Sequence, residues 1–529
     1  MNRIGPAGKP LKYHQTSTAT GRKGIVPAKV SGCRSSSWIE KAGISFFIIA
    51  MLVPALAAAG REREATFVRT GLQAQSGSKP NIVCILADDL GWSDAGWHGS
   101  EIRTPALDRL AASGAKLEQF YVQPVCSPTR AALLTGRYPM RYGLQVGVVR
   151  PWAQYGLPLE ERTLPQALQE AGYFTAITGK WHLGHFQPAY LPTRRGFDHQ
   201  YGHYNGALDY FTHIRDGGFD WHRNDQICRD EGYTTSLIGR EAVRLIEGHD
   251  RSRPLFLYVT FNAPHAPLQA LQEHLELYSW IADKNRRPYA AMVTALDQQV
   301  AQIVAALDKR GMTAETLIFF SSDNGGPTQL GATNGKFRAG KGTLYEGGVR
   351  VPAFASWPSR IKSGTVVREP LHIVDWYPTL LRLAGASLTQ GRPVDGKDIW
   401  LTITAGRRSP HQEILLNAAP ATGAIRVGNW KLVLNGRVSA AEGENAPQSG
   451  ANENPAERPI AGGASETELF NLADDPWEKV DLAAKESGKL QELRKRYEAL
   501  ARQAVPPKAR PRPADFRSPK VWGEKENLP

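Results

Sequence analysis

From residue 80 onward the chain alternates apolar runs with amphipathic segments. The run "NIVCILADDLGW" begins at residue 81, and four later stretches each pair a helical pattern with an apolar run. Uniformly apolar strands that alternate with helices are typical of a parallel sheet covered by helices on both faces. The sequence therefore predicts an α/β fold built on a large, mostly parallel sheet. The four later stretches are residues 104–122, 163–184, 235–265 and 297–326.

The pattern changes after residue 404. We expect residues 79–404 to form the main domain and residues 405–529 to form a small α+β subdomain with an antiparallel sheet and one helix. Residues 424–436 have the alternating character of one strand. Residues 439–466, rich in Gly, Ala, Asn and Glu, predict a mobile loop, and the tail of the chain is rich in proline.

Residues 1–78 have the composition of a largely disordered leader. Residues 44–59 are apolar, follow several basic residues and end in the small residues "ALAAA", which is the pattern of a secretory signal. We therefore expect an exported protein, periplasmic or extracellular in a bacterial setting, that meets the membrane only transiently. The alternative is a membrane anchor made by residues 44–59, although this run is short for a bilayer span.

Cysteine usage and charge narrow the class of protein further. The chain has four cysteines, and removal of the leader would leave Cys84, Cys126 and Cys228, too few for a disulfide framework. The formal net charge is +13, and residues 1–59 carry eight Lys or Arg and one acid, so the remainder carries +6. No cluster of Lys and Arg marks a nucleic-acid groove, and we expect no nucleic-acid partner.

Acidic and amide side chains follow two of the predicted strands. Asp88 and Asp89 end the first apolar run, and Asp323 and Asn324 end the run "ETLIFFSS". The carboxyl ends of parallel strands meet at one edge of a sheet, so these side chains should lie together. A set of oxygen donors suits a hard cation such as Ca²⁺ or Mg²⁺. The alternative is that each acid caps the helix that follows it.

Cations and imidazoles follow other strands at the same predicted edge. Lys180 and His182 end one run, His265 ends another, and Lys341 lies in a Gly-rich loop. A single loop Lys or His is more often an ordinary polar residue, but here all four share one edge. A cation with Lys and His nearby suits displacement of a negatively charged tetrahedral group from an alcohol.

The stretch "QPVCSPTRAALLTGRYP" places Cys126 at the predicted start of a short helix. Ser127 before Pro128 is typical of a capped helix start, and Gly136 closes the apolar run. A helix start presents free N–H groups and a partial positive charge. The environment of Cys126 therefore favours an anion.

The motif "CSPTRAALLTGR" resembles the Cys-x-Pro-x-Arg signature of type I, formylglycine-dependent sulfatases, in the alkaline phosphatase superfamily. The likeness extends from about residue 80 to the C terminus through "ADDLGWSDAGWHGS", "GKWHLG", "LPTRRGFD", "FSSDNGG", "EGGVR" and "ELFNLADDPWE". Within this family the sequence is most similar to the arylsulfatase B, or N-acetylgalactosamine-4-sulfatase, group. The resemblance implies a large mixed, mostly parallel sheet sandwiched by helices, and hydrolysis of sulfate monoesters.

The resemblance also implies how the chemistry proceeds. A formylglycine-generating enzyme would oxidise Cys126 to formylglycine, an aldehyde whose hydrate carries two hydroxyl groups. One hydroxyl would attack the sulfate sulfur, and the second would later expel sulfate as the aldehyde reforms. One divalent cation, with Ca²⁺ preferred over Mg²⁺, would assist. Its implied ligands are Asp88, Asp89, Cys126, Asp323 and Asn324.

The resemblance assigns the remaining roles residue by residue. Arg130 would hold the diol with its fork of donors. Lys180 and Lys341 would contact sulfate oxygens. His182 would be the base that releases sulfate, and His265, together with Lys341, would protonate the departing alkoxide.

The implied substrate is an aryl sulfate or a sulfated carbohydrate such as N-acetylgalactosamine 4-sulfate. One alternative is a phosphonate or phosphate ester hydrolase of the same superfamily. Another is a sulfated-glycan-binding protein without catalysis, which would follow if Cys126 remained a thiol.

Overall fold

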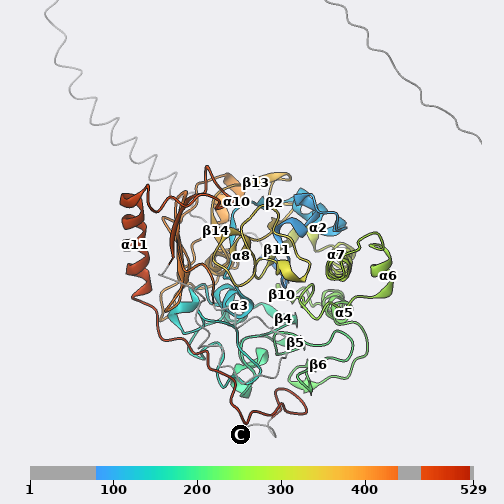
Figure 1. The fold of residues 1–529 in the computed structure, drawn as a ribbon. Helices are drawn as coiled ribbons and strands as arrows, with labels where there is room; N and C mark the ends of the chain where they lie inside the picture. Colours follow the sequence, from blue (N-terminus) through green and yellow to red (C-terminus); the bar gives the residue numbers. More distant parts are fainter. Residues whose placement is uncertain (1–78, 439–465, 525–529) are drawn as a thin grey trace, which may run out of the picture. The chain divides into compact units, whose positions relative to one another are not determined.

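The computed structural model of this chain describes residues 79–438 and 466–524 (Figure 1). All of these residues belong to one compact unit. The predicted leader with its apolar segment 44–59 lies outside the described residues, as does all but the last residue of the predicted loop 439–466.

A ten-stranded sheet forms the centre of the fold. The strands β11, β1, β10, β4 and β5 lie side by side and are parallel, while antiparallel pairs occur toward both edges. The predicted large mixed, mostly parallel sheet is thereby confirmed. In spatial order the strands are β13 (Thr365–Val367), β2 (Ala115–Leu117), β12 (Ala353–Ser356), β11 (Thr316–Ser322), β1 (Asn81–Ala87), β10 (Leu255–Thr260), β4 (Phe174–Gly179), β5 (His199–Gly202), β8 (His222–Arg223) and β9 (Gln226–Ile227).

Strand β1 shows why the central strands are apolar throughout. All seven of its residues are buried. Successive side chains of a strand point to opposite faces of the sheet. Val83 and Ile85 accordingly enter one hydrophobic core, whereas Ile82 and Cys84 enter the other. Helices must therefore cover both faces.

The helices divide between these two cores (Figure 1). On one face α2, α5 and α7 contribute Leu107, Ile238 and Met292. On the other face α3 and α9 contribute Leu133 and Leu380. The helices are α2 (Pro105–Ser113), α3 (Cys126–Thr135), α4 (Leu164–Glu170), α5 (Thr234–Glu247), α6 (Gln272–Glu276), α7 (Arg286–Lys309), α8 (Glu346–Val349), α9 (Trp376–Leu383), α10 (Trp400–Ala405) and α11 (Ser487–Ala501).

Among the helices of the described residues, α7 alone is long and apolar enough to cross a membrane. Its apolar window is 72% buried inside the protein, however, and it packs against α2 and α5. Its hydrophobicity therefore belongs to the core of the fold.

A second, antiparallel sheet has the order β15-β16-β17-β18, and α11 packs against it. The expectation of one strand across residues 424–436 is wrong. Gly428 adopts a φ of +56° and, with Asn429, turns the chain so that Val427 pairs with Trp430 in a hairpin. The strands are β15 (Ile414–Ala418), β16 (Gly423–Val427), β17 (Trp430–Leu434) and β18 (Thr467–Asn471).

A buried ion-pair cluster joins this second sheet to helix α8. Lys431 of β17 is fully buried, and its Nζ lies 2.9 Å from Glu346 Oε1 and 2.8 Å from Glu478 Oε1. Tyr121 donates a hydrogen bond of 2.8 Å to the other oxygen of Glu346. Buried charges are tolerated when they are paired and hydrogen-bonded in this way. Lys431 therefore attaches the small sheet to the segment that follows the Gly-rich loop of Lys341.

We expect Lys431→Met to lower the free energy of unfolding by about 3–5 kcal/mol, because it leaves the buried carboxylate of Glu478 without its cation and Glu346 with only Arg350 at 3.4 Å. The control is Lys309→Met, which removes an exposed pair with Glu247 and should cost less than about 1 kcal/mol. Chemical denaturation of both variants measures the difference. Equal losses would show that the buried cluster does not attach the sheet.

Candidate active site

Four of the predicted site residues lie at the carboxyl ends of the paired strands β1 and β11. Ala87 of β1 pairs with Ser322 of β11, so the residues that follow emerge side by side. All four side chains are buried: Asp88, Asp89, Asp323 and Asn324. The backbone N–H of Asp323 donates to the Ala87 carbonyl at 3.0 Å, which continues the strand pairing into the site.

Cys126 is the first residue of α3. The residue before it, Val125, is extended and caps the helix without a side-chain hydrogen bond, so the expectation that Ser127 caps this helix is wrong. Ser127 lies inside the first turn, where its Oγ donates to the His182 carbonyl at 2.8 Å and accepts from the Val149 N–H at 3.0 Å. Ser127 therefore ties the helix start to two neighbouring loops.

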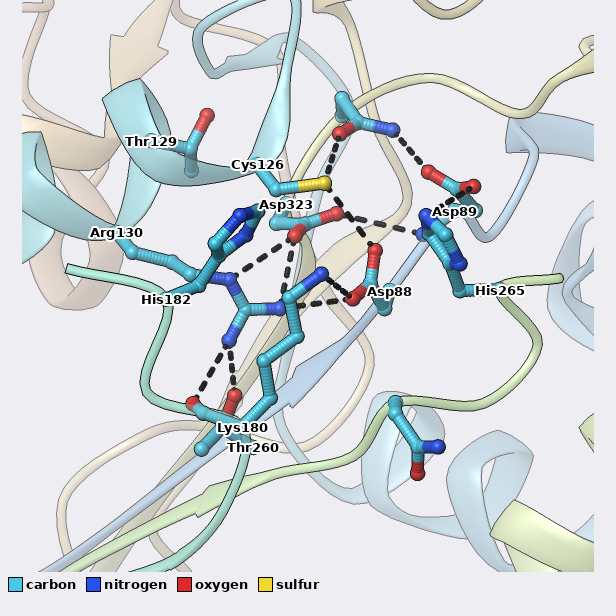
Figure 2. A network of polar contacts seen from close by, with 12 residues as sticks. Asp88, Asp89, Cys126, Thr129, Arg130, Lys180, His182, Thr260, His265 and Asp323 are labelled. Carbon is cyan, nitrogen blue, oxygen red and sulfur yellow. Dashed lines mark hydrogen bonds and ion pairs between the residues drawn. The ribbon is translucent and has the colours of Figure 1, made fainter. Parts of the chain in front are cut away.

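The sulfur of Cys126 faces the acidic cluster (Figure 2). Its Sγ lies 3.4 Å from Asp88 Oδ1 and 3.4 Å from Asn324 Oδ1. Burial raises the pKa of the Cys126 thiol well above its ordinary value, and the carboxylates of Asp323 and Asp88 raise it further. Because the thiolate is the nucleophilic form of cysteine, an unmodified Cys126 is held in an unreactive state.

Arg130 lies one helical turn after Cys126 and faces the same cluster. Its guanidinium Nη2 lies 3.2 Å from Asp88 Oδ2 and 2.8 Å from Asp323 Oδ2, with all three side chains fully buried. Its Nη1 donates to the Lys180 carbonyl at 3.2 Å and to the Thr260 hydroxyl. Arg130 thus links α3 to the ends of four parallel strands.

Thr260 is a site residue that the sequence analysis missed. It is the last residue of β10 and is buried, with its hydroxyl on Arg130. The argument that identified Asp88 and Lys180, namely a polar residue at the end of an apolar strand, applies equally to Thr260.

Two lysines approach the cluster from different loops. Lys180 Nζ lies 2.6 Å from Asp88 Oδ2, and Lys341 Nζ lies 2.8 Å from Asp89 Oδ1. The Asp89 carboxylate also accepts a hydrogen bond of 2.7 Å from Asn324. The predicted cations and acids are therefore in direct contact.

The cations act unequally on the buried acids. Burial by itself raises the pKa of Asp88, but Lys180, His265 and the other nearby cations more than offset this and hold that pKa well below its usual range. For Asp323, burial and the negative charge of Asp88 together raise the pKa. Arg130, which contacts both carboxylates, opposes this rise at Asp323.

Glycines bring the loop of Lys341 against the end of β11. A Cβ at Gly325 would lie 1.8 Å from the Gly347 carbonyl oxygen, so only glycine permits this approach. The N–H of Gly325 also donates to the Gly348 carbonyl at 2.9 Å. The motifs "DNGG" and "EGGV" therefore pack backbone to backbone, which carries Lys341 to Asp89.

The two histidines present different nitrogens to the site. His182 Nε2 lies 3.1 Å from the Val149 carbonyl, so Nε2 carries the hydrogen and Nδ1 keeps a lone pair, as a base requires. His265 Nδ1 lies 2.6 Å from the Ala266 carbonyl, and its Nε2 faces Asp89 Oδ2 at 3.7 Å. His265 therefore directs Nε2 toward the cluster.

The donor set fits a metal ion. Ligand atoms of Asp88, Asp89, Cys126 and His265 all lie within 4.8 Å of one another, and all four residues are buried. Asn324 contacts Asp89 and Cys126, and the Asp89 N–H lies 3.3 Å from Asp323 Oδ1. His265 was not among the predicted ligands. Because the other donors are mostly oxygens, the set favours a hard cation.

Comparisons with known proteins point to one family. The sulfatase family profile matches residues 80–386. The chain is 40% identical to arylsulfatase J of Mus musculus over 84% of this chain and 80% of the relative, and 37% identical to mouse N-acetylgalactosamine-6-sulfatase over 64% of this chain and 68% of the relative. The solved structure of Ps i-CgsB in complex with k-i-k-neocarrahexaose superposes with a TM-score of 0.72 at 33% identity, covering 81% of this chain and 94% of that one.

We expect a divalent cation to stabilise the protein through this cluster. At a free Ca²⁺ concentration about 100-fold above the Kd, the gain is about 2.7 kcal/mol, seen as a rise in Tm over chelated protein. Asp89→Asn should abolish the rise. Asp297→Asn, which alters a buried aspartate of α7 that accepts hydrogen bonds from the N–H groups of Ala106 and Leu107 in α2, should keep it. If the Tm of the wild-type protein changed neither with chelator nor with added Ca²⁺, the metal site would be contradicted.

Proposed function

This chain belongs to the sulfatase family and is a sulfuric ester hydrolase, and we propose that it removes sulfate from sulfated carbohydrates by way of a formylglycine made from Cys126. The observation that carries the proposal is the contact of the Cys126 sulfur with Asp88 and Asn324 at the start of α3. A residue placed there lies against the acidic cluster, in which Asp88 is paired with Lys180 and Asp89 with Lys341.

The environment of residue 126 supports its conversion. As a thiol it is buried among carboxylates that keep it protonated, which makes it a poor nucleophile. A formylglycine hydrate at this position supplies one hydroxyl as nucleophile and a second for release of the product. A formylglycine-generating enzyme would be the maturation partner.

The chain's own residues orient the reacting groups. Arg130 lies one turn beyond residue 126, and its ion pairs with Asp88 and Asp323 fix its fork of donors. Lys180 and Lys341 place their ammonium groups where they would bind the sulfate oxygens. These contacts would hold the sulfur in line with the nucleophile.

Two histidines would move the protons. With its Nε2 hydrogen on the Val149 carbonyl, His182 offers Nδ1 as the base that accepts a proton from the second hydroxyl. His265 directs Nε2 to the opposite side of the cluster, beside Asp89 and Lys341, where it would protonate the departing oxygen.

Asp88, Asp89, Asp323, Asn324 and residue 126 would hold one divalent cation, with Ca²⁺ preferred over Mg²⁺. Such an ion supplies positive charge that lowers the pKa of the nucleophilic hydroxyl and polarises the sulfate. The oxygen-rich, buried donor set supports this assignment.

The comparisons support a carbohydrate sulfate as substrate. One relative is an N-acetylgalactosamine-6-sulfatase, and the structure of Ps i-CgsB holds an oligosaccharide. N-acetylgalactosamine 4-sulfate is our candidate because sequence motifs such as "LPTRRGFD" resemble the arylsulfatase B group, although the relatives reported above are an arylsulfatase J and an N-acetylgalactosamine-6-sulfatase. Aryl sulfates would serve as surrogate substrates. The apolar segment 44–59, with basic residues before it, supports export to the periplasm or beyond.

Conversion of Cys126 gives the direct test. Mass spectrometry of the tryptic peptide 117–130 from active protein should show a loss of about 18 Da, because H₂S leaves and oxygen is gained. Cys126→Ala should lose sulfate release while the protein stays folded. Cys228→Ala, at a partly exposed cysteine outside the site, should keep it. Active protein with an unmodified peptide would contradict the mechanism.

We expect the effect of His265→Ala to depend on the leaving group. A sugar alkoxide needs protonation, so kcat/KM for N-acetylgalactosamine 4-sulfate should fall by about 10²–10⁴-fold. The nitrophenolate of 4-nitrophenyl sulfate is a weak base, and its release should fall much less. His274→Ala, at a buried histidine outside the cluster, should affect both esters alike. If His265→Ala lowered kcat/KM by the same factor for both esters, His265 would not be the acid that protonates the leaving group.

A further inference from the structure

The C-terminal tail is attached to a loop beside the active site. After α11 it runs along residues 139–155, where the N–H groups of Val505 and Lys508 donate to the carbonyls of Met140 at 2.9 Å and Gly143 at 2.8 Å. The Trp152 indole N–H donates to the Arg510 carbonyl at 3.3 Å. In Figure 1 the red tail leaves α11 and continues to the C-terminal label.

Tail and loop together build an aromatic and cationic surface. Arg150 and Arg512 place their Cζ atoms 5.7 and 5.8 Å from the ring centroid of Trp152. Phe516 packs edge-on against the same indole at 6.3 Å, and Arg512 lies 5.4 Å from its ring. We call these four residues, Arg150, Trp152, Arg512 and Phe516, the Trp152 platform.

The tail side of the platform carries uncompensated positive charge. Residues 503–523 contain five Lys or Arg and one acid, Asp515. Arg512 is exposed, and the guanidinium groups of Arg510 and Arg517 donate to carbonyls of the tail itself. Within residues 79–438 and 466–524, no ion pair joins Arg512 to a carboxylate. An anion bound here would relieve the repulsion between neighbouring cations.

The platform is close to the catalytic residues. Val148 packs against Cys126, and the next residue, Val149, contacts Ser127 through its N–H at 3.0 Å and His182 through its carbonyl at 3.1 Å. Trp152 follows Val149 by three residues, so their Cα atoms are at most about 11 Å apart. A short oligosaccharide spans that distance.

We propose that the Trp152 platform is a subsite for a second, anionic sugar of the polysaccharide whose sulfate ester is cleaved. The apolar face of the sugar ring would stack on the exposed part of the indole. Its sulfate or carboxylate would pair with Arg512, whose planar fork suits both groups. The inference rests on the proposed function and adds to it a preference for oligosaccharides over single sulfated sugars.

The test compares two arginines of the same tail. In Arg512→Ala, the ratio of kcat/KM for a sulfated hexasaccharide to kcat/KM for 4-nitrophenyl sulfate should fall about tenfold, mainly through KM for the hexasaccharide. Arg512→Lys should recover part of this ratio. Arg517→Ala, an exposed arginine of the same tail that lies outside the platform, should keep the wild-type ratio. Equal ratios in Arg512→Ala and Arg517→Ala would overturn the proposal.

A binding experiment separates this inference from the proposed function. Calorimetry with Cys126→Ala protein and the same hexasaccharide should show binding that weakens about tenfold when Arg512→Ala or Trp152→Ala is added, and that falls with salt. If the wild-type protein releases no sulfate but the platform variants still lose binding, the proposed function fails and the subsite stands. If sulfate is released and neither platform variant changes binding, only the subsite fails.

Discussion

The buried guanidinium of Arg130 is the group on which the geometry of the site depends. It projects from α3 and meets carboxylates that follow β1 and β11, the backbone after β4 and the last residue of β10. A buried charge must be paired to be tolerated, and Arg130 cannot lose its proton to escape that requirement. Its ion pairs therefore fix the start of α3, and with it residue 126, against the edge of the sheet.

The sequence was sufficient to predict this edge because two simple rules combine. Uniformly apolar strands indicated a parallel sheet, and parallel strands carry their C-terminal residues to one edge. Asp88, Asp323, Lys180 and His265 follow different strands, yet the register of β1 with its neighbours brings them together. Thr260 also ends an apolar strand at this edge, but it was not predicted because only charged and amide side chains and histidines were considered.

Other features depend on contacts that local sequence does not encode. Ser127 before a proline has the local pattern of a cap, but its hydroxyl is used by Val149 and His182, which lie 22 and 55 residues away. A two-residue turn at Gly428 divides one apolar run into a hairpin, since alternation alone does not distinguish one long strand from two short ones. The sequence of the tail likewise does not predict that Phe516 packs against Trp152, because that contact joins segments far apart in the chain.

The charges of the site bear on which ester it suits. Three carboxylates, Asp88, Asp89 and Asp323, face three cations, Arg130, Lys180 and Lys341, so the side chains alone are close to neutral. A divalent cation held by these acids would add two positive charges in a buried place, where uncompensated charge is costly. A sulfate monoester brings one negative charge, and an ionised hydroxyl at residue 126 brings the second. A phosphate monoester brings up to two charges of its own. Protonated His265, which its role as an acid requires, adds one more positive charge beside Asp89. The charge of the site therefore accommodates either ester, and the choice of sulfate rests on the family to which the chain belongs.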